Sequence, residues 1–144
     1  MNSSPDIVKV LIVSVQDISA VAVSGLESAS YIDKLTSPIS TNTAPNSGDL
    51  SITAKTDRVY TPTGGPSTTI VVSEGGEKKF SIARDNLNEV VVWNPWTDAK
   101  IMGDFKPVDG YKQMICVEPG TVKGWQKLEA GETWEGGQII TAYY

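Results

Sequence analysis

The sequence predicts an all-β protein built as a sandwich of antiparallel strands. β-branched and aromatic residues recur in runs of strand length, and Gly-, Pro- and Ser-rich turns separate many of these runs. No window keeps the apolar period of an amphipathic helix. Short strands at regular spacing are typical of sandwiches. A chain of 144 residues is long enough for one ordinary domain.

Strands are expected along most of the chain, and the segments between them indicate how they connect. The runs that predict strands are 7–15, 20–23, 50–54, 58–60, 69–72, 79–84, 89–93, 114–118, 125–129 and 138–143. Segments 63–66 and 74–77 look like hairpin connections, and 130–132 a turn between the last two strands. The polar segment 36–48 is expected to be a loop or ragged edge, and 96–102 could form a short helical turn.

The amino-acid composition of the chain argues against nucleic-acid and membrane partners. The net charge of −5 argues against nucleic acid, since phosphate backbones favour clustered Lys and Arg. The longest apolar runs are about four or five residues, too short for a membrane span, so no membrane partner is expected. A single cysteine excludes an internal disulfide and suits a reducing cytoplasm.

The chain contains no histidine, which removes whole reaction classes. Nucleophile systems of the Ser-His-Asp or Cys-His kind cannot be assembled from it. One cysteine and no histidine make a zinc site implausible. The Gly-Gly pairs lack the spacing of phosphate-binding motifs. Acid–base chemistry would therefore come from carboxylates, Tyr, Lys or Cys, and we expect neither a metal nor a cofactor.

Several separated motifs, in a consistent order, resemble one family of sugar-processing enzymes. From residue 17 to 144 the chain resembles the C-terminal half of the hexose-6-phosphate mutarotases, the glucose-6-phosphate 1-epimerase branch of the aldose 1-epimerase family. The matching residues are Asp17-Ile18, Val21, Val23, Gly25-Leu26, Tyr31-Ile32-Asp33, Thr56-Asp57-Arg58-Val59-Tyr60, Val92-Trp93-Asn94-Pro95-Trp96, Cys116-Val117-Glu118-Pro119-Gly120, and a closing hairpin of Leu128 with Gly131-Glu132-Thr133-Trp134.

The resemblance implies a galactose-mutarotase-like β-sandwich, or supersandwich, of which this chain carries a partial, C-terminal half. Residues 1–16 then form an atypical N-terminal segment, expected to be a strand, and residues 17–144 form the mutarotase-like part. Half of a large sandwich leaves unpaired strand edges, so we expect the chain to associate with itself or with another β protein.

The resemblance also implies a reaction, the interconversion of the α and β anomers of a hexose 6-phosphate such as glucose 6-phosphate. A base and an acid on opposite sides of the sugar suffice, without a cofactor. By resemblance Glu118 is the base, Asp57 holds sugar hydroxyls, and Trp93 and Trp96 are candidates to stack on the sugar. Strand alternation puts Glu118 on one face with Cys116, beside apolar neighbours that would raise its pKa.

Each of these residues also has a purely structural interpretation. Glu118 could be a solvated glutamate at a strand end, and Asp57 a turn carboxylate paired with Arg58 or Lys55. Both tryptophans could be core residues. Alternation sends Arg58 to the face opposite Asp57, which makes Arg58 a poor candidate for the same cleft.

The chain departs from the family at the general acid. The family carries a histidine shortly before the equivalent of Asp17-Ile18, but here that segment is the apolar run 10–15. The arginines that hold the phosphate belong to the half that is absent. Losing one acid–base partner costs about 100- to 10,000-fold in rate. We therefore expect a truncated, impaired epimerase; the alternative is a non-catalytic sugar-phosphate-binding or β-sheet interaction module.

Overall fold

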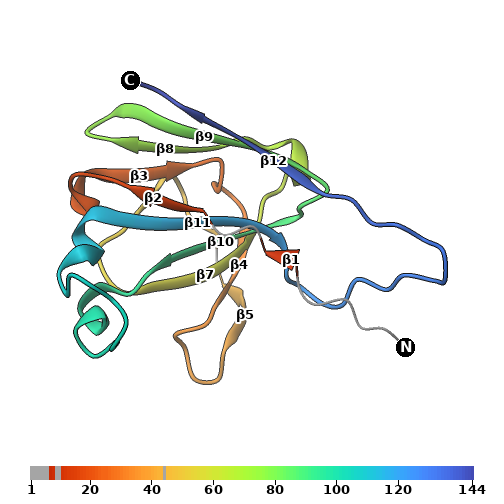
Figure 1. Ribbon diagram of the computed structural model, residues 1–144, viewed down its shortest axis with the longest axis horizontal. Helices are drawn as coiled ribbons and strands as arrows, with labels where there is room; N and C mark the ends of the chain where they lie inside the picture. Colours follow the sequence, from red (N-terminus) through yellow and green to blue (C-terminus); the bar gives the residue numbers. More distant parts are fainter. Residues whose placement is uncertain (1–6, 9–10, 44) are drawn as a thin grey trace.

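The computed structural model describes residues 7–8, 11–43 and 45–144, and within them it is a two-layer β-sandwich. One sheet has seven strands and the other has five. Figure 1 shows the two sheets stacked on each other. Every strand pairing in these residues is antiparallel. The described residues contain short 3₁₀ turns but no α-helix, and hence no helix that could cross a membrane. The prediction of an all-β sandwich is confirmed.

The seven-stranded sheet carries the candidate site. Its order is β1–β11–β10–β7–β4–β5, and β2 pairs with β11 on the same side as β1. The strands are β1 (Ile7–Val8), β2 (Ile12–Ser14), β4 (Ser30–Asp33), β5 (Ser40–Thr43), β7 (Thr56–Thr61), β10 (Glu89–Asn94) and β11 (Met114–Thr121).

The five-stranded sheet covers one face of the larger one. Its order is β12–β9–β8–β3–β6, so β12 and β6 form its edges. The strands are β3 (Val21–Ser24), β6 (Leu50–Ser51), β8 (Ile70–Glu74), β9 (Glu77–Asp85) and β12 (Gly137–Ala142). A tight turn of Gly75 and Gly76, with φ of 60° and 84°, joins β8 to β9, as a two-residue hairpin turn requires.

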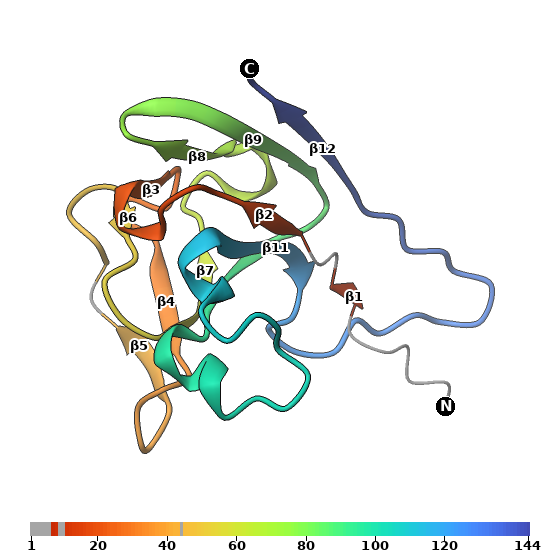
Figure 2. The same cartoon turned by 60° about the vertical axis from the view of Figure 1, so that its left-hand side comes forward.

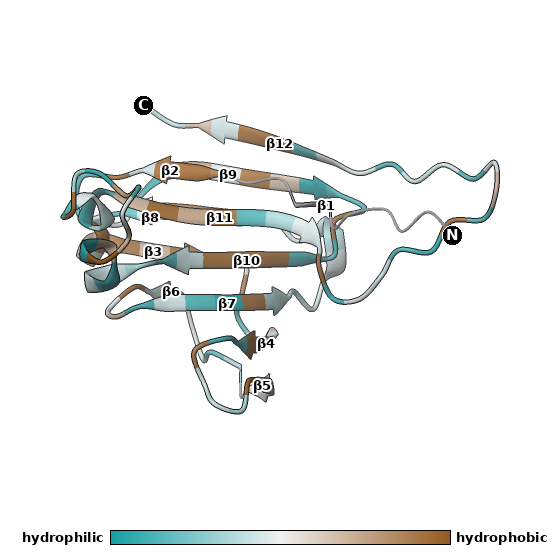
Figure 3. Cartoon of the chain, turned by 60° about the horizontal axis from the view of Figure 1, so that its bottom comes forward, coloured by the Kyte–Doolittle hydropathy of each residue, from teal (hydrophilic) through white to brown (hydrophobic). Residues whose placement is uncertain are grey.

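The hydrophobic core lies between the two sheets. Alternating positions of the larger sheet point into it, including Val90 and Val92 of β10 and Ile115 and Val117 of β11. Figure 2 shows the layers from a second direction, with β8 and β9 apart from β11, and Figure 3 shows the hydrophobic stretch along β10. The opposite alternation of β11, with Met114, Cys116 and Glu118, faces away from the smaller sheet. The predicted alternation is therefore correct.

Short 3₁₀ turns shape the ends of the strands. They are η1 (Ile18–Ala20), η2 (Gly65–Ser67), η3 (Trp96–Lys100) and η4 (Gly110–Gln113). The turn η3 falls within the segment expected to form a short helical turn. Because η3 and η4 pack against each other, they close the end of the sheet where β10 leaves and β11 enters.

The described part of the N-terminal segment extends the larger sheet. β2 pairs with the first half of β11, with Val13 opposite Ile115, and β1 pairs with the second half. The strand expected over 7–15 is thus two short strands, and residues 9–10 lie outside the described residues, as do residues 1–6. The boundary proposed at residue 16 remains a prediction.

Segment 36–48, expected to be a loop or ragged edge, contains the edge strand β5, which pairs with β4 through a register shift.

Three local expectations were wrong. Segment 125–129 forms no strand: it belongs to the long excursion seen in Figure 1, where Trp125 is 70% exposed. The turn expected at 130–132 is present, with the Glu132 N–H donating to the carbonyl of Glu129, but it does not connect two strands. Segment 63–66 connects β7 to β8 in different sheets, so it is a crossover and not a hairpin connection.

Candidate functional site

Glu118 lies on the outer face of the larger sheet, in a row that crosses three strands. Val91 of β10 is directly opposite Glu118, and Val59 of β7 is directly opposite Val91. Directly opposed residues of antiparallel strands point to the same face. Both valines are buried and Glu118 is half-buried, so an apolar floor extends from the carboxylate toward β7.

A second, adjacent row brings Trp93 and Asp57 to the same face. Trp93 is opposite Cys116 on one side and opposite Asp57 on the other. Neighbouring strands lie about 4.8 Å apart, so the backbones of β11 and β7 are separated by about 10 Å across β10. Glu118 and Asp57 therefore flank an open strip of sheet whose middle is Val91 and Trp93.

Lys34 completes the second row and was not predicted. Its backbone N–H donates to the carbonyl of Asp57 at 3.0 Å, and its Nζ lies 3.7 Å from Asp57 Oδ1. Asp57 is thus paired with Lys34, and neither with Arg58 nor with Lys55, which pairs with Asp98. Lys34 directly follows the Tyr31-Ile32-Asp33 motif, but only the pairing of β4 with β7 brings it to Asp57.

The environment of Glu118 raises the pKa of its carboxyl group. Partial burial is the main cause, and the negative charge of Asp57 adds to it. Cys116 and the ammonium group of Lys34 act in the opposite direction. A carboxylate whose pKa lies above the ordinary value is a stronger base when ionised, which suits proton abstraction from a hydroxyl group.

Cys116 stays a thiol at neutral pH. Burial and the adjacent Glu118 carboxylate raise its pKa to about 12. It is the single cysteine of the sequence and is 2% exposed. It therefore serves as a small packing residue under the site and not as a nucleophile.

Trp96 begins η3, beyond the end of β10, and belongs to neither of these rows. Its ring packs against the core and against Tyr111, with ring centroids 5.5 Å apart. Asn94 holds the preceding turn: its Nδ2 donates to the carbonyls of Tyr111 and Met114 at 2.8 and 2.9 Å, and its Oδ1 accepts from the Trp96 N–H at 2.8 Å. These contacts favour the core interpretation for Trp96, and its stacking on a sugar remains a prediction.

Arg58 points to the opposite face from Asp57, as alternation predicted. Its guanidinium group lies 4.7 Å from the centroid of the Tyr31 ring and donates to the Tyr60 hydroxyl at 3.2 Å. Asp33 Oδ2 lies 3.6 Å from its Nε. This cluster ties β4 to β7 from the inner side, behind the pair of Lys34 and Asp57.

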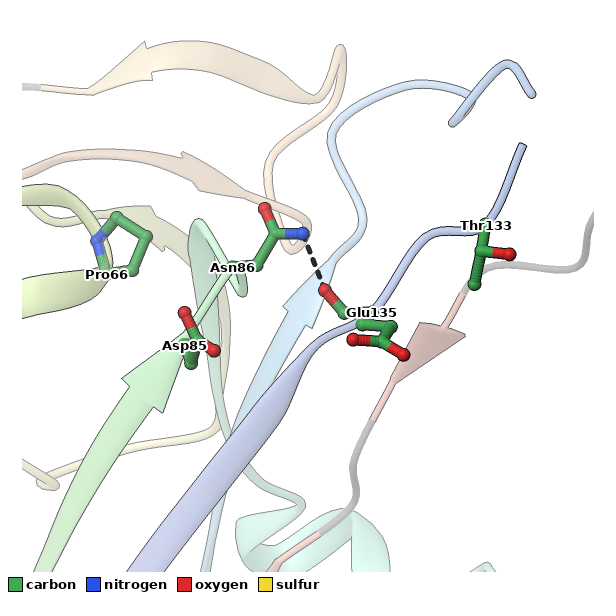
Figure 4. Close-up of a pocket in the computed structure, with 5 residues that line it drawn as sticks. All are labelled: Pro66, Asp85, Asn86, Thr133 and Glu135. Atoms are coloured by element: carbon green, nitrogen blue, oxygen red, sulfur yellow. Dashed lines mark hydrogen bonds between the residues drawn. The ribbon is translucent and has the colours of Figure 1, made fainter. Parts of the chain in front are cut away.

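A separate surface hollow lies at the far end of β9. Figure 4 shows its lining residues Pro66, Asp85, Asn86, Thr133 and Glu135, with Asn86 Nδ2 donating to the backbone carbonyl of Glu135 at 2.6 Å. It contains none of the four candidate residues. Within the described ranges, no three acidic or thiol side chains gather as a ligand set for a metal ion.

The outer face therefore offers a partly desolvated carboxylate, a second carboxylate with an ammonium partner, and an indole ring between them. Comparison with known proteins identifies the family. The family model described as aldose 1-epimerase matches residues 13–141. The chain belongs to the aldose 1-epimerase family.

Two relatives carry the same name. A Cenchrus ciliaris protein named "Putative glucose-6-phosphate 1-epimerase" is 36% identical over 130 residues, which are 89% of this chain and 38% of the relative. An Escherichia coli K12 protein of the same name is 32% identical over 116 residues, 80% of this chain and 37% of the relative. The chain thus spans less than two-fifths of the length of either relative.

Solved structures support the fold. The crystal structure of a protein from Salmonella typhimurium described as a "putative mutarotase" (YeaD) has a TM-score of 0.69 at 24% identity, covering 96% of this chain and 45% of that one. The crystal structure of HI1317 has a TM-score of 0.66 at 19% identity, covering 95% and 46%. The galactose-mutarotase-like sandwich is confirmed, with the chain matching a little under half of each structure.

Proposed function

We propose that this chain carries the basic side of a hexose-6-phosphate 1-epimerase site. Glu118 would remove the proton from the anomeric hydroxyl, which opens the sugar ring and allows it to close on the other face. Asp57 would hold sugar hydroxyls as a hydrogen-bond acceptor, and Trp93 would pack against the apolar face of the ring. The observation that carries the proposal is the gathering of Glu118, Trp93 and Asp57 on one outer face of the sheet.

The site proposed for this chain has a base but no histidine to act as the proton donor. Ring opening requires a proton on the ring oxygen, and the sequence has no histidine to provide it. Water would have to supply the proton, or a group outside this chain. We therefore infer a slow epimerase, with a rate about 100- to 10,000-fold below that of a site with both partners.

The test is the exchange between the α and β anomers of glucose 6-phosphate, followed by NMR exchange spectroscopy. We expect a modest acceleration over the spontaneous rate, and a loss of at least about tenfold of that acceleration in Glu118→Gln. Glu135→Gln, which removes an exposed carboxylate elsewhere, is the matched control and should leave the rate unchanged. Equal rates for the protein and for buffer would contradict the catalytic proposal.

Binding without catalysis is the second candidate, and the absence of histidine favours it. In that case glucose 6-phosphate should change the intrinsic tryptophan fluorescence although the anomers exchange no faster. The change should disappear in Trp93→Phe and persist in Trp125→Phe, because Trp125 is 70% exposed on the excursion before β12. Loss of the response in both variants, or in neither, would contradict a sugar site at Trp93.

We also infer that the chain associates with itself through exposed sheet edges. Open edges carry unpaired backbone donors and acceptors, which favour pairing with another strand. A monodisperse monomer in sizing chromatography at micromolar concentration would contradict the self-association.

We also place this chemistry in the cytoplasm, because a buried free thiol is compatible with a reducing compartment.

A further inference from the structure

The strand β12 is an open edge of the five-stranded sheet. It pairs with β9 along its whole length, from Gly137 opposite Asp85 to Ala142 opposite Phe80. On its other side, no strand of the described residues pairs with it. Figure 3 shows β12 at the margin of the molecule with a hydrophobic middle.

The other sheet edges in the described residues are short or irregular. β6 has two residues, and the edge formed by β1 and β2 is divided into pieces of two and three residues. β5 pairs with β4 through a register shift. β12 has six residues in unbroken register, so it is the edge best suited to accept another strand.

The pattern of hydrogen bonds between β12 and β9 shows which backbone groups of β12 do not bond to β9. The N–H of Tyr143 donates to the carbonyl of Lys79 at 2.9 Å. In an antiparallel ladder, alternate residues direct both their N–H and C=O to the same neighbour. Ile139 and Thr141 therefore bond to β9, while Gln138, Ile140 and Ala142 present their backbone groups to the open side.

This edge also lacks the usual protection against pairing. Natural edge strands carry charges, Pro residues or bulges that prevent association. Residues 137–142 have no charge and no Pro, and the strand has no bulge. Ile139 and Ile140 are 70% and 42% exposed, one on each face of the strand. Pairing would cover both.

We propose that β12 pairs antiparallel with β12 of a second copy of this chain, with Ile140 opposite Ile140 of the second copy. The register follows from the free backbone groups. Gln138 then faces Ala142 of the second copy, and each exposed donor and acceptor meets its counterpart. The neighbouring register, with Ile139 opposite itself, would leave Ala142 opposite Gly136, outside the strand.

A second copy fits this edge for two further reasons. The pattern of free groups is symmetric about Ile140, as a twofold axis normal to the sheet requires. The chain has a net charge of −5, which disfavours close contact between copies elsewhere, whereas an uncharged strand opposes no like charges. This pairing makes specific the self-association proposed above, and it does not depend on the sugar chemistry.

The first test is sedimentation velocity over a concentration series of the full chain. Ile140→Lys would place two ammonium groups opposite each other across the axis, and we expect it to raise the dimer dissociation constant at least about tenfold. Ile139→Lys adds the same charge to the same strand but faces Thr141 of the second copy, so it should raise the dissociation constant clearly less than Ile140→Lys does. Circular dichroism verifies that both variants keep the β fold.

The second test fixes the register by disulfide formation. In the proposed register Ile139 and Thr141 of the second copy are a non-hydrogen-bonded pair, with Cα atoms about 4.5 Å apart, within disulfide reach. A mixture of Ile139→Cys and Thr141→Cys chains should give mainly the mixed disulfide by mass spectrometry. Buried Cys116 should not compete.

Three results would overturn the proposal. The first is a wild-type chain that stays monomeric at micromolar concentration, as in the sizing test above. The second is a dimer that Ile140→Lys does not weaken, which would move the association to another surface. The third is a predominance of disulfides between two Ile139→Cys chains, which would reject the register. None of these results bears on exchange catalysed by Glu118.

Discussion

The position of Glu118 on the sheet disfavours the ionised form of its carboxyl group. Its neighbours Val91 and Val59 are buried, and Asp57 lies across the strip with a charge of the same sign. Both effects disfavour the ionised form, and Lys34 only partly opposes them. A group placed in this way is costly for folding at neutral pH, which is typical of residues kept for chemistry.

This cost predicts the pH dependence of a neutral variant. The folded state raises the pKa of Glu118, so it binds the proton more tightly than the unfolded chain does. The resulting stabilisation is present below the unfolded pKa and disappears as pH rises through the folded pKa. Glu118→Gln should therefore melt at a slightly higher temperature than wild type at pH 8, and the advantage should vanish near pH 4.

Thermal melts of the two proteins at both pH values measure this difference, with Glu135→Gln as the control for net charge. A variant that is less stable than wild type at pH 8 would mean that Glu118 is a structural carboxylate.

At the same scale, the sequence could predict faces but not neighbours. Alternation correctly put Glu118 and Cys116 on one face of the sheet. It also correctly put Arg58 on the other face of the sheet from Asp57. It could not identify Lys34 as the partner of Asp57, because that contact depends on β4 lying beside β7. Strand order is a tertiary property that depends on non-local contacts and leaves little trace in local residue patterns.

The elements around the site depend on one buried amide. Asn94 is fully buried, and it connects the end of β10 to η3, η4 and the start of β11. Asn94→Ala would leave two carbonyls and one N–H without partners. We expect a loss of about 1–3 kcal/mol in the free energy of unfolding.

Urea denaturation of Asn94→Ala provides this measurement. Asn88→Ala is the control, because the Asn88 side chain is exposed and should change stability by less than about 0.5 kcal/mol. Equal midpoints for the two variants would show that the turn at 94–96 does not depend on the Asn94 amide.

Strand-rich segments with apolar alternation were predicted well, and the failures have physical reasons. β5 was not predicted as a strand because its four residues are polar and show no apolar alternation. It forms through backbone pairing with β4. Segment 125–129 contains Trp125 and Leu128, but these side chains remain exposed and no strand pairs there. An apolar pattern predicts a strand only where a partner and a second layer cover it.

At the scale of the whole molecule, the chain packs a core between two sheets while matching under half of each of the two solved structures. The inner faces of the sheets supply this core, so the outer face with Glu118 and Asp57 does not need to be covered for the sandwich to form. The proposed base, Glu118, thus lies on a segment that packs its own core, and the proposed reaction takes its proton from water or from a group outside this chain.

The pairing of β2 with β11 joins two parts of the chain that are distant in sequence. Val13 of β2 lies opposite Ile115 of β11, with most of the described chain between them. Until this pair forms, β2 has no partner strand among the described residues, and the larger sheet is incomplete beside the strand that carries Glu118. Such long-range pairing is slow, and we expect refolding in about milliseconds to seconds, measurable by stopped-flow fluorescence. A microsecond phase carrying the full amplitude would mean that β11 assembles without waiting for its distant partner.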